Sequence, residues 1–183
     1  MKIAAAVGLF LAVAAAGALA FIYSGVYDIS ATTPHFGATH RILRTVMEQS
    51  VKRQARDVKV PELDDPEKVH SGFRSFNAMC VTCHAAPGAP ASDINKGLYP
   101  KAPDLTLAAK GWTPAELYVI VKRGIKMSGM PAWEPTHSGE QLWELVAFLK
   151  VLPTMPAAEY QSAMEYLAAS PGGKNHDMKA GSH

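Results

Sequence analysis

The hydrophobic pattern divides the chain into an uninterrupted apolar beginning and a longer part in which apolar and polar residues alternate. No charged residue occurs from Ile3 to Tyr27, and Ala, Val, Leu, Ile, Phe and Gly dominate that run. A helix needs about 20 apolar residues to cross a bilayer, so residues 1–27 are long enough to form a membrane anchor. Tyr23 and Tyr27 would lie at the membrane surface, where aromatic side chains are enriched.

A cleaved signal peptide is the alternative interpretation of residues 1–27. Lys2 provides a minimal positive n-region, and Ala-Leu-Ala at 18–20 resembles a cleavage site. A secretory apolar region normally runs about 7–15 residues, however, and this one continues well past Ala20. We therefore favour a retained single-pass helix, with the chain after Asp28 exported. Cleavage would instead leave a soluble exported protein.

Beyond residue 28 the apolar positions recur at helical spacing, and no alternating strand pattern of useful length is present. The first helix expected there covers residues 39–56 and opens at Thr39. Its apolar face carries Ile42, Leu43, Val46, Met47 and Val51. Its other face is basic, with Arg41, Arg44, Lys52, Arg53 and Arg56. Such a helix can lie on an anionic membrane surface, dock on a partner subunit or pack on its own domain. The regular basic face favours the partner.

Capping signals predict further helices. Asp65 followed by Pro66 is typical of an N-cap and a first helical turn, and Thr113 and Ser138 each begin a capping box. The stretch 85–106 is rich in Pro, Gly and Ala and is expected to be a long loop with little regular structure. The helices expected from caps and apolar spacing cover residues 66–79, 114–124, 140–152 and 157–169.

Charge and cysteine content narrow the range of functions. The 18 Lys and Arg nearly balance the 16 Asp and Glu, so the composition gives no indication of nucleic-acid binding. Cys80 and Cys83 are the only cysteines. A single locally spaced pair in an exported domain does not form a disulfide scaffold, so this pair is expected to serve chemistry.

Cys80, Cys83 and His84 form a Cys-x-x-Cys-His motif. A redox dithiol is typical of such a pair beside a βαβ unit, and no strand is expected here. A zinc site would need further ligands at comparable spacing, which the scattered His35, His40, His70 and His137 do not provide. The remaining interpretation is covalent attachment of haem c, in which both sulfurs lie on one helical face and His84 binds the iron.

A sixth iron ligand would separate an electron carrier from a haem catalyst. Met130 lies in a Gly-Met-Pro segment, far in sequence from His84, where Gly129 permits close approach of the backbone and Pro131 stiffens the loop. An isolated methionine is more often a core side chain, but the upstream motif makes Met130 the expected ligand. Met127, one turn away, is the alternative.

The segment 65–152 resembles a class I c-type cytochrome domain, specifically those of membrane-anchored bacterial monohaem cytochromes. It combines a helix with Gly72 and Phe76 before the motif, a Pro-Asp-Leu loop, the Gly-Met-Pro segment and a closing apolar helix. The resemblance implies an all-α cytochrome c fold, with helices and long loops around one covalently bound haem c. It also implies that Gly72 and Phe76 pack against Leu145 and Phe148.

The same resemblance assigns a role to one backbone carbonyl near the haem. It implies that the Pro103 carbonyl holds the Nδ1–H of His84 and leaves Nε2 free for the iron.

Tyr99 could contact a haem propionate, and Trp133 could cover the haem or bond a propionate; ordinary packing is the alternative for both. Lys122, Arg123 and Lys126 could form a positive rim for an acidic partner, or a solvated helix end. His176, Met178 and His183 in the tail could bind copper weakly.

The expected organisation has four parts: residues 1–27 as anchor or signal peptide, 28–64 as a juxtamembrane linker with the basic helix, 65–153 as the haem domain, and 154–183 as a short helix and disordered tail. The expected function is electron transport rather than enzymatic catalysis. A membrane-tethered monohaem cytochrome with His84/Met130 ligation would pass single electrons between redox partners of a respiratory chain. The resemblance to membrane-anchored bacterial cytochromes implies a bacterial inner membrane with the haem domain on the periplasmic side, or a soluble periplasmic protein if the signal is cleaved. The alternatives are a cytochrome subunit of a larger membrane oxidoreductase, a haem enzyme or gas sensor with an open sixth site, and, least favoured, a thiol oxidoreductase.

Overall fold

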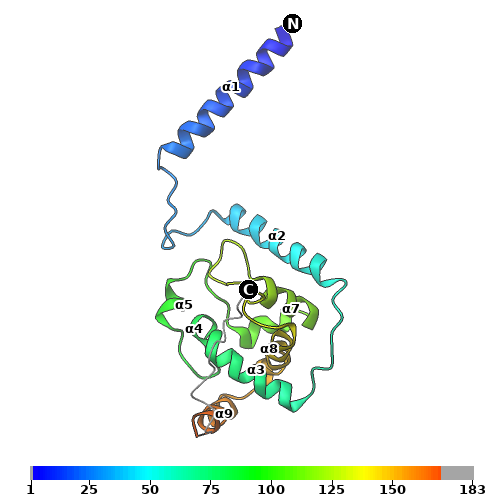
Figure 1. Cartoon of the computed structure of the whole chain (residues 1–183). Helices are drawn as coiled ribbons and strands as arrows, with labels where there is room; N and C mark the ends of the chain where they lie inside the picture. Colours follow the sequence, from blue (N-terminus) through cyan, green and yellow to red (C-terminus); the bar gives the residue numbers. More distant parts are fainter. Residues whose placement is uncertain (1, 170–183) are drawn as a thin grey trace. The chain divides into compact units, whose positions relative to one another are not determined.

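A computed structural model describes residues 2–169 and divides the chain into two units, which meet between Pro34 and His35. The first unit contains helix α1 (Lys2–Tyr23), and the second contains the remaining helices (Figure 1). All regular structure within residues 2–169 is helical, so the predicted all-α class is confirmed. Every residue of α1 is exposed, and the helix is long and apolar enough to cross a membrane, a test that a signal sequence also passes.

Three helices of the second unit begin at their predicted caps. The Asp65 side chain accepts a hydrogen bond from the backbone of Glu67 at the start of α3, and complete capping boxes begin α7 at Thr113 and α8 at Ser138. The longer helices are α2 (Gly37–Ala55), α3 (Pro66–Met79), α7 (Pro114–Arg123), α8 (Gly139–Val151) and α9 (Ala157–Ala169).

Two sequence predictions on local structure require correction. Helix α2 begins at Gly37 rather than Thr39, and its N-cap residue, Phe36, makes no side-chain cap. The stretch 85–106 is also more ordered than a plain loop. It contains α5 (Asp93–Gly97) and the start of α6 (Leu105–Ala108), because Ser92 and Asp104 side chains cap backbone N–H groups there.

The core of the second unit is organised by the crossing of α3 and α8. Phe76 and Phe148 are fully buried, with ring centroids 5.1 Å apart. A Cβ placed on Gly72 would lie 2.0 Å from the carbonyl oxygen of Glu144 and 2.8 Å from Cβ of Phe148. The two backbones can therefore approach this closely only because residue 72 has no side chain. The implied packing of Gly72 and Phe76 against Phe148 is present.

Replacement of Gly72 by alanine is expected to destabilise the domain strongly. The added methyl group meets backbone atoms of α8, which cannot move aside as a flexible side chain does, so the helices must separate. Overpacking of a core typically costs about 1–3 kcal/mol, and we expect the upper end of that range. Denaturant unfolding of the haem-loaded protein measures the loss. Gly111→Ala is the matched control, because a Cβ there meets nothing within 4 Å; equal losses in both variants would contradict the proposed role of the crossing.

Helix α2 packs on its own domain along one side. Val51 and Ala55 are buried in a small cluster with Val119 of α7, and Trp112 borders this cluster. Of the three alternatives for α2, packing on its own domain is therefore the one that the structure supports for this side of the helix. Ile42 and Val46 remain exposed. The boundary between the two units runs through the expected linker 28–64, and Leu63 is buried in the main core.

Helix α9 also belongs to the domain surface. Tyr160 is buried, its ring lies 5.2 Å from that of Phe73 in an edge-to-face arrangement, and its hydroxyl donates a hydrogen bond to the side chain of Asn77 on α3. The three tail residues considered as copper ligands, His176, Met178 and His183, lie outside the described residues.

Candidate haem-binding site

Cys80 and Cys83 lie at the junction of α3 and a short helix, α4 (Val81–His84). The backbone continues helically across the motif, since the N–H groups of Cys83 and His84 both donate to the carbonyl of Cys80, at 3.0 and 2.8 Å. Both cysteines are partly buried and unpaired, and Cys80 packs against the main core. The spacing therefore places two thiols one helical turn apart beside an apolar core, as the sequence predicts.

The environment of Cys80 does not favour thiol–disulfide chemistry. Burial raises the pKa of the Cys80 thiol to about 12, and the neighbouring Cys83 adds to the shift. Thiol exchange requires a thiolate, which reactive cysteines obtain from a lowered pKa in an electropositive setting. This arrangement argues against the dithiol alternative.

His84 is oriented by a backbone contact. Its Nδ1 lies 2.9 Å from the carbonyl oxygen of Pro103, so Nδ1–H donates and Nε2 carries the free lone pair. Burial lowers the pKa of His84, and the bond to Pro103 acts in the opposite direction. The neutral imidazole with a fixed tautomer is the form that binds a metal ion. The contact implied for Pro103 is therefore present.

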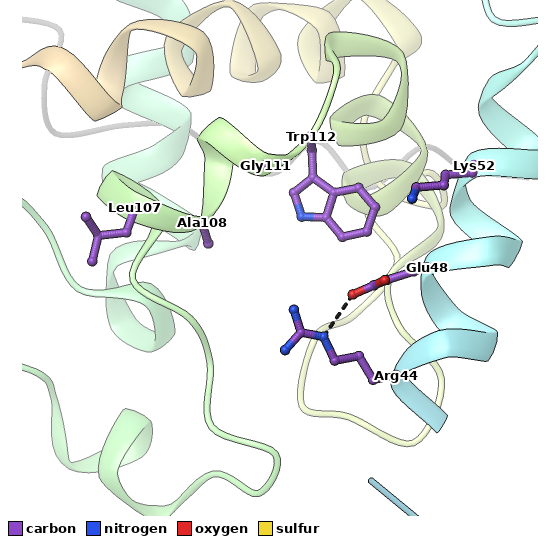
Figure 2. A pocket seen from close by; sticks show the side chains of 7 residues that line it. All are labelled: Arg44, Glu48, Lys52, Leu107, Ala108, Gly111 and Trp112. Atoms are coloured by element: carbon purple, nitrogen blue, oxygen red, sulfur yellow. Dashed lines mark hydrogen bonds and ion pairs between the residues drawn. The ribbon is translucent and has the colours of Figure 1, made fainter. Parts of the chain in front are cut away.

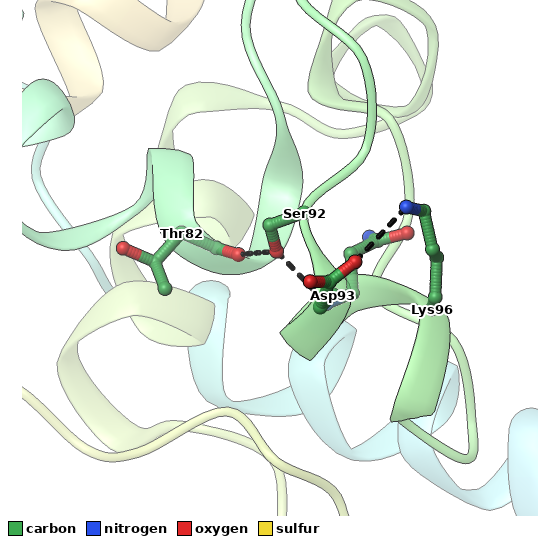
Figure 3. Close-up of polar contacts among 5 residues, drawn as sticks. Thr82, Ser92, Asp93 and Lys96 are labelled. Carbon is green, nitrogen blue, oxygen red and sulfur yellow. Dashed lines mark hydrogen bonds and ion pairs between the residues drawn. The ribbon is translucent and has the colours of Figure 1, made fainter.

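Asn95, which the sequence analysis did not single out, connects this helix to the loop that carries Pro103. It is 3% exposed, and its side-chain amide donates to the carbonyl of Cys83 and, at 3.2 Å, to that of Ala102. Ser92 caps α5 and its hydroxyl also donates to the carbonyl of Thr82 (Figure 3). The sequence around Ser92 indicates a capped turn, but no local pattern indicates that Asn95 is buried.

Replacement of Asn95 by alanine is expected to destabilise the site. It removes both hydrogen bonds and leaves the carbonyls of Cys83 and Ala102 without this donor, at a cost of about 1–3 kcal/mol for an unsatisfied buried group. Denaturant unfolding of the haem-loaded protein measures the change. Lys96→Ala is the control on the same helix, because it removes only an exposed ion pair with Asp93, typically worth about 0–1 kcal/mol. Similar losses in both variants would remove Asn95 from the site.

The loop after α7 places Met130 against the core and Met127 in solvent. Met130 is partly buried and packs on the main cluster, whereas Met127 is 82% exposed. Gly124, at the start of this loop, has φ +63°. A Cβ placed on Gly124 would lie 2.5 Å from the backbone of Pro131. The N–H of Ile125 donates to the carbonyl of Met130 at 3.2 Å and closes the loop. Of the two methionines, Met130 is the one that packs on the core cluster to which Cys80 also belongs.

Gly129 lies close to a side chain of another loop. A Cβ there would lie 2.6 Å from Cδ2 of Leu98, so the glycine accommodates a side chain of the loop that also carries Pro103. The Met130 loop and the segment after α5 are thereby in contact.

The remaining predicted neighbours occupy defined positions. The Tyr99 hydroxyl accepts a hydrogen bond from the backbone N–H of His35 at 2.7 Å. Trp133 packs against the main core, and its ring lies edge-to-face to His137 at 5.3 Å. Lys122 and Arg123 lie 3.1 and 3.7 Å from carboxylate oxygens of Glu134, which reduces the net charge of the expected basic rim.

Other potential sites lie apart from the motif. A cavity of about 350 Å³ opens beside α2, where Trp112 faces the ion pair of Arg44 and Glu48 (Figure 2), and its lining includes neither motif cysteine nor His84. Within residues 2–169, no group of three or more His, Cys, Asp or Glu side chains is placed to hold a metal ion.

The fold and the motif geometry define a c-type cytochrome domain. Residues 67–149 match a family model described as cytochrome C oxidase, cbb3-type, subunit III. Residues 67–149 are accordingly a class I c-type cytochrome domain, and such a domain implies covalently bound haem c. Comparisons with curated proteins and with solved structures gave no match.

The residues present fit a covalently attached haem. The two thiols lie one turn apart, the His84 ring is held with Nε2 free, and Met130 is available from a separate loop on the same core. The surroundings of Cys80 are apolar, as a largely buried macrocycle requires.

Proposed function

We propose that the protein is a membrane-tethered monohaem cytochrome that transfers single electrons on the periplasmic side, with His84 and Met130 as axial ligands. The observation that supports this most directly is the pairing of an oriented His84 with a partly buried Met130 beside the same core. The c-type cytochrome domain indicates haem-based electron transfer, and α1 has the length and hydropathy of a single membrane span.

The protein residues set the properties of the redox centre. When bound, haem c supplies a one-electron Fe(III)/Fe(II) couple. Cys80 and Cys83 would hold the group covalently. The Pro103 carbonyl accepts the Nδ1–H of His84 and so leaves Nε2 free to bind the iron. The Met130 thioether favours the reduced state relative to a second histidine and so raises the potential. Apolar surroundings act in the same direction, because they solvate the more positive oxidised centre poorly.

A second candidate function is that of a cytochrome subunit within a larger membrane oxidoreductase. The description of the matching family, a subunit of a cbb3-type oxidase, supports it. Both functions use the same haem site and differ in whether the protein stays with its redox partners. A haem enzyme or gas sensor would require that Met130 leave the iron open, and its partly buried position beside the core favours ligation instead.

Visible spectroscopy of the haem-loaded full chain tests the ligand set. The reduced protein should show the sharp α-band of a low-spin c-type haem, and the oxidised protein the weak long-wavelength band of methionine–iron ligation. The native reduced protein should not bind CO. Gentle detergent extraction from native membranes then distinguishes the two functions: release as a single chain supports a tethered carrier, and constant copurification with oxidase subunits supports the complex.

A further inference from the structure

The outward side of α2 carries an apolar surface that the domain leaves uncovered. We call it the α2 patch and define it by Phe36, Ile42, Leu43 and Val46. Phe36 is 76% exposed, Ile42 is 62% exposed and Val46 is 60% exposed. Ile42 and Val46 are separated by one helical turn and share a face, whereas the buried side of the same helix is formed by Val51 and Ala55. The patch therefore faces away from the domain's own contacts on α7.

Positive charge surrounds the α2 patch. Arg53 follows Val46 by two helical turns and so lies on the same face, and Arg41 is adjacent to Ile42. The only acid within α2, Glu48, is paired with Arg44 at 2.8 Å. The exposed side of α2 thus combines bulky apolar side chains with uncompensated cations, the composition of a helix that lies in the surface of an anionic membrane.

The chain connection limits how far the α2 patch can be from a membrane that holds α1. Residues 24–36 join the two helices, and at about 3.3–3.6 Å per residue they span at most roughly 45 Å. This connector adds exposed apolar side chains of its own, Val26 and Ile29. A short tether raises the effective concentration of the patch at the membrane surface, so that even a weak interaction is populated.

We propose that the α2 patch binds the surface of an anionic bilayer, with Phe36, Ile42, Leu43 and Val46 in the interfacial region and Arg41 and Arg53 at the lipid phosphates. This inference rests on the proposed role of α1 as a retained anchor. Side chains of one short helix suffice for an interfacial contact, whereas a stable protein interface needs a broader surface. The tether and the charge favour lipid over a partner subunit.

Membrane binding through α2 would also orient the haem site. His35, which precedes α2, is held against Tyr99 by the hydrogen bond to its hydroxyl and by rings 5.1 Å apart. Leu98 beside it contacts Gly129 of the Met130 loop. The loops of the haem site are therefore fixed to the same end of α2 as the α2 patch, so binding of the patch would hold these loops near the membrane surface.

Site-directed spin labelling of the full chain tests this proposal. In the haem-loaded protein both native cysteines are thioethers, so Val46→Cys provides the only free thiol for a nitroxide. The protein is reconstituted into vesicles of phosphatidylethanolamine and phosphatidylglycerol, and the label's collision rates with oxygen and with a neutral nickel chelate are compared. Thr45→Cys is the matched control, since position 45 is exposed on the adjacent, non-patch side of α2.

The proposal predicts a severalfold higher ratio of oxygen to nickel collisions at position 46 than at 45, and loss of this difference in phosphatidylcholine vesicles at high salt. Ile42→Glu introduced into the position-46 label variant should abolish the difference, and Leu107→Glu, at an exposed apolar residue outside the patch, should not. Equal ratios at 45 and 46 would overturn the proposal. Shielding of position 46 from both reagents in native membranes but not in vesicles would also overturn the proposal, because it would indicate a protein partner.

Two readouts separate this inference from the proposed function. The visible spectrum of each variant reports the haem ligands, which the α2 substitutions should leave unchanged. An unchanged spectrum with equal ratios would reject membrane binding by α2 and leave the electron-transfer function intact. Loss of the protein from vesicles on alkaline washing would reject the anchor, and the inference with it.

Discussion

Replacement of Met130 by alanine is expected to leave the haem attached and to open one axial position of the iron. Covalent attachment depends on Cys80 and Cys83, which the substitution does not touch, while alanine has no sulfur to reach the metal. The reduced variant should therefore bind CO, which the native protein should not, and the long-wavelength methionine band of the oxidised protein should disappear. Loss of the thioether should also lower the reduction potential, because methionine favours the reduced state.

Met127→Ala is the control for this experiment. Met127 is 82% exposed, so its removal should change neither CO binding nor the spectrum. Met130 also packs on the core, so its truncation to alanine costs some stability. Met130→Leu keeps most of that volume without a ligand and should bind CO as the alanine variant does. CO binding by the Met127 variant alone would show that the assignment of Met130 is wrong.

Replacement of both Cys80 and Cys83 by alanine is expected to abolish covalent attachment and to compromise the fold. No thioether can form without the thiols, and Cys80 packs directly against the cluster around Phe76 and Phe148. The haem would otherwise complete this core, so its loss removes a large buried apolar surface, at about 25 cal/mol per Å². Haem staining after denaturing electrophoresis measures attachment, and circular dichroism during thermal unfolding measures the fold.

Thr82→Ala is the matched control within the same turn. The Thr82 residue is exposed, and its backbone carbonyl, which accepts a hydrogen bond from Ser92, is kept in the variant. This variant should retain both haem staining and stability. Haem that survives denaturation in the double cysteine variant would contradict covalent attachment at this motif, and an unchanged unfolding temperature would contradict the contribution of the haem to the core.

Features that depend on neighbouring residues were predicted well from the sequence. The caps at Asp65, Thr113 and Ser138 join groups two or three residues apart, so the same residues that signal a helix start also form it. The Cys-x-x-Cys-His motif is also contiguous, and one helical turn suffices to bring its thiols to one face. Such short-range geometry scarcely depends on the rest of the fold.

Packing partners were harder to infer, because hydrophobic periodicity shows that a helix has an apolar side but not what covers it. The sequence favoured a partner subunit as the cover of α2. In the structure α7 of the same domain covers Val51 and Ala55, and Ile42 and Val46 are exposed. The approach of Leu98 to Gly129 could likewise not be inferred from the sequence, because the two residues lie on loops far apart in the chain.

The sequence by itself determined the all-α class, the helix starts at Asp65, Thr113 and Ser138 and the contiguous Cys-x-x-Cys-His motif, because each follows from residue type and short spacing. Only the tertiary structure decided that Asn95 joins Cys83 to Ala102, that His35 is held on Tyr99 and that one side of α2 remains uncovered. Asn95 bonds through its side chain to the backbone carbonyls of Cys83 and Ala102, and Tyr99 bonds through its hydroxyl to the backbone N–H of His35 before α2. Such contacts exist only after hydrophobic burial has brought those elements together, so no local pattern of residues encodes them.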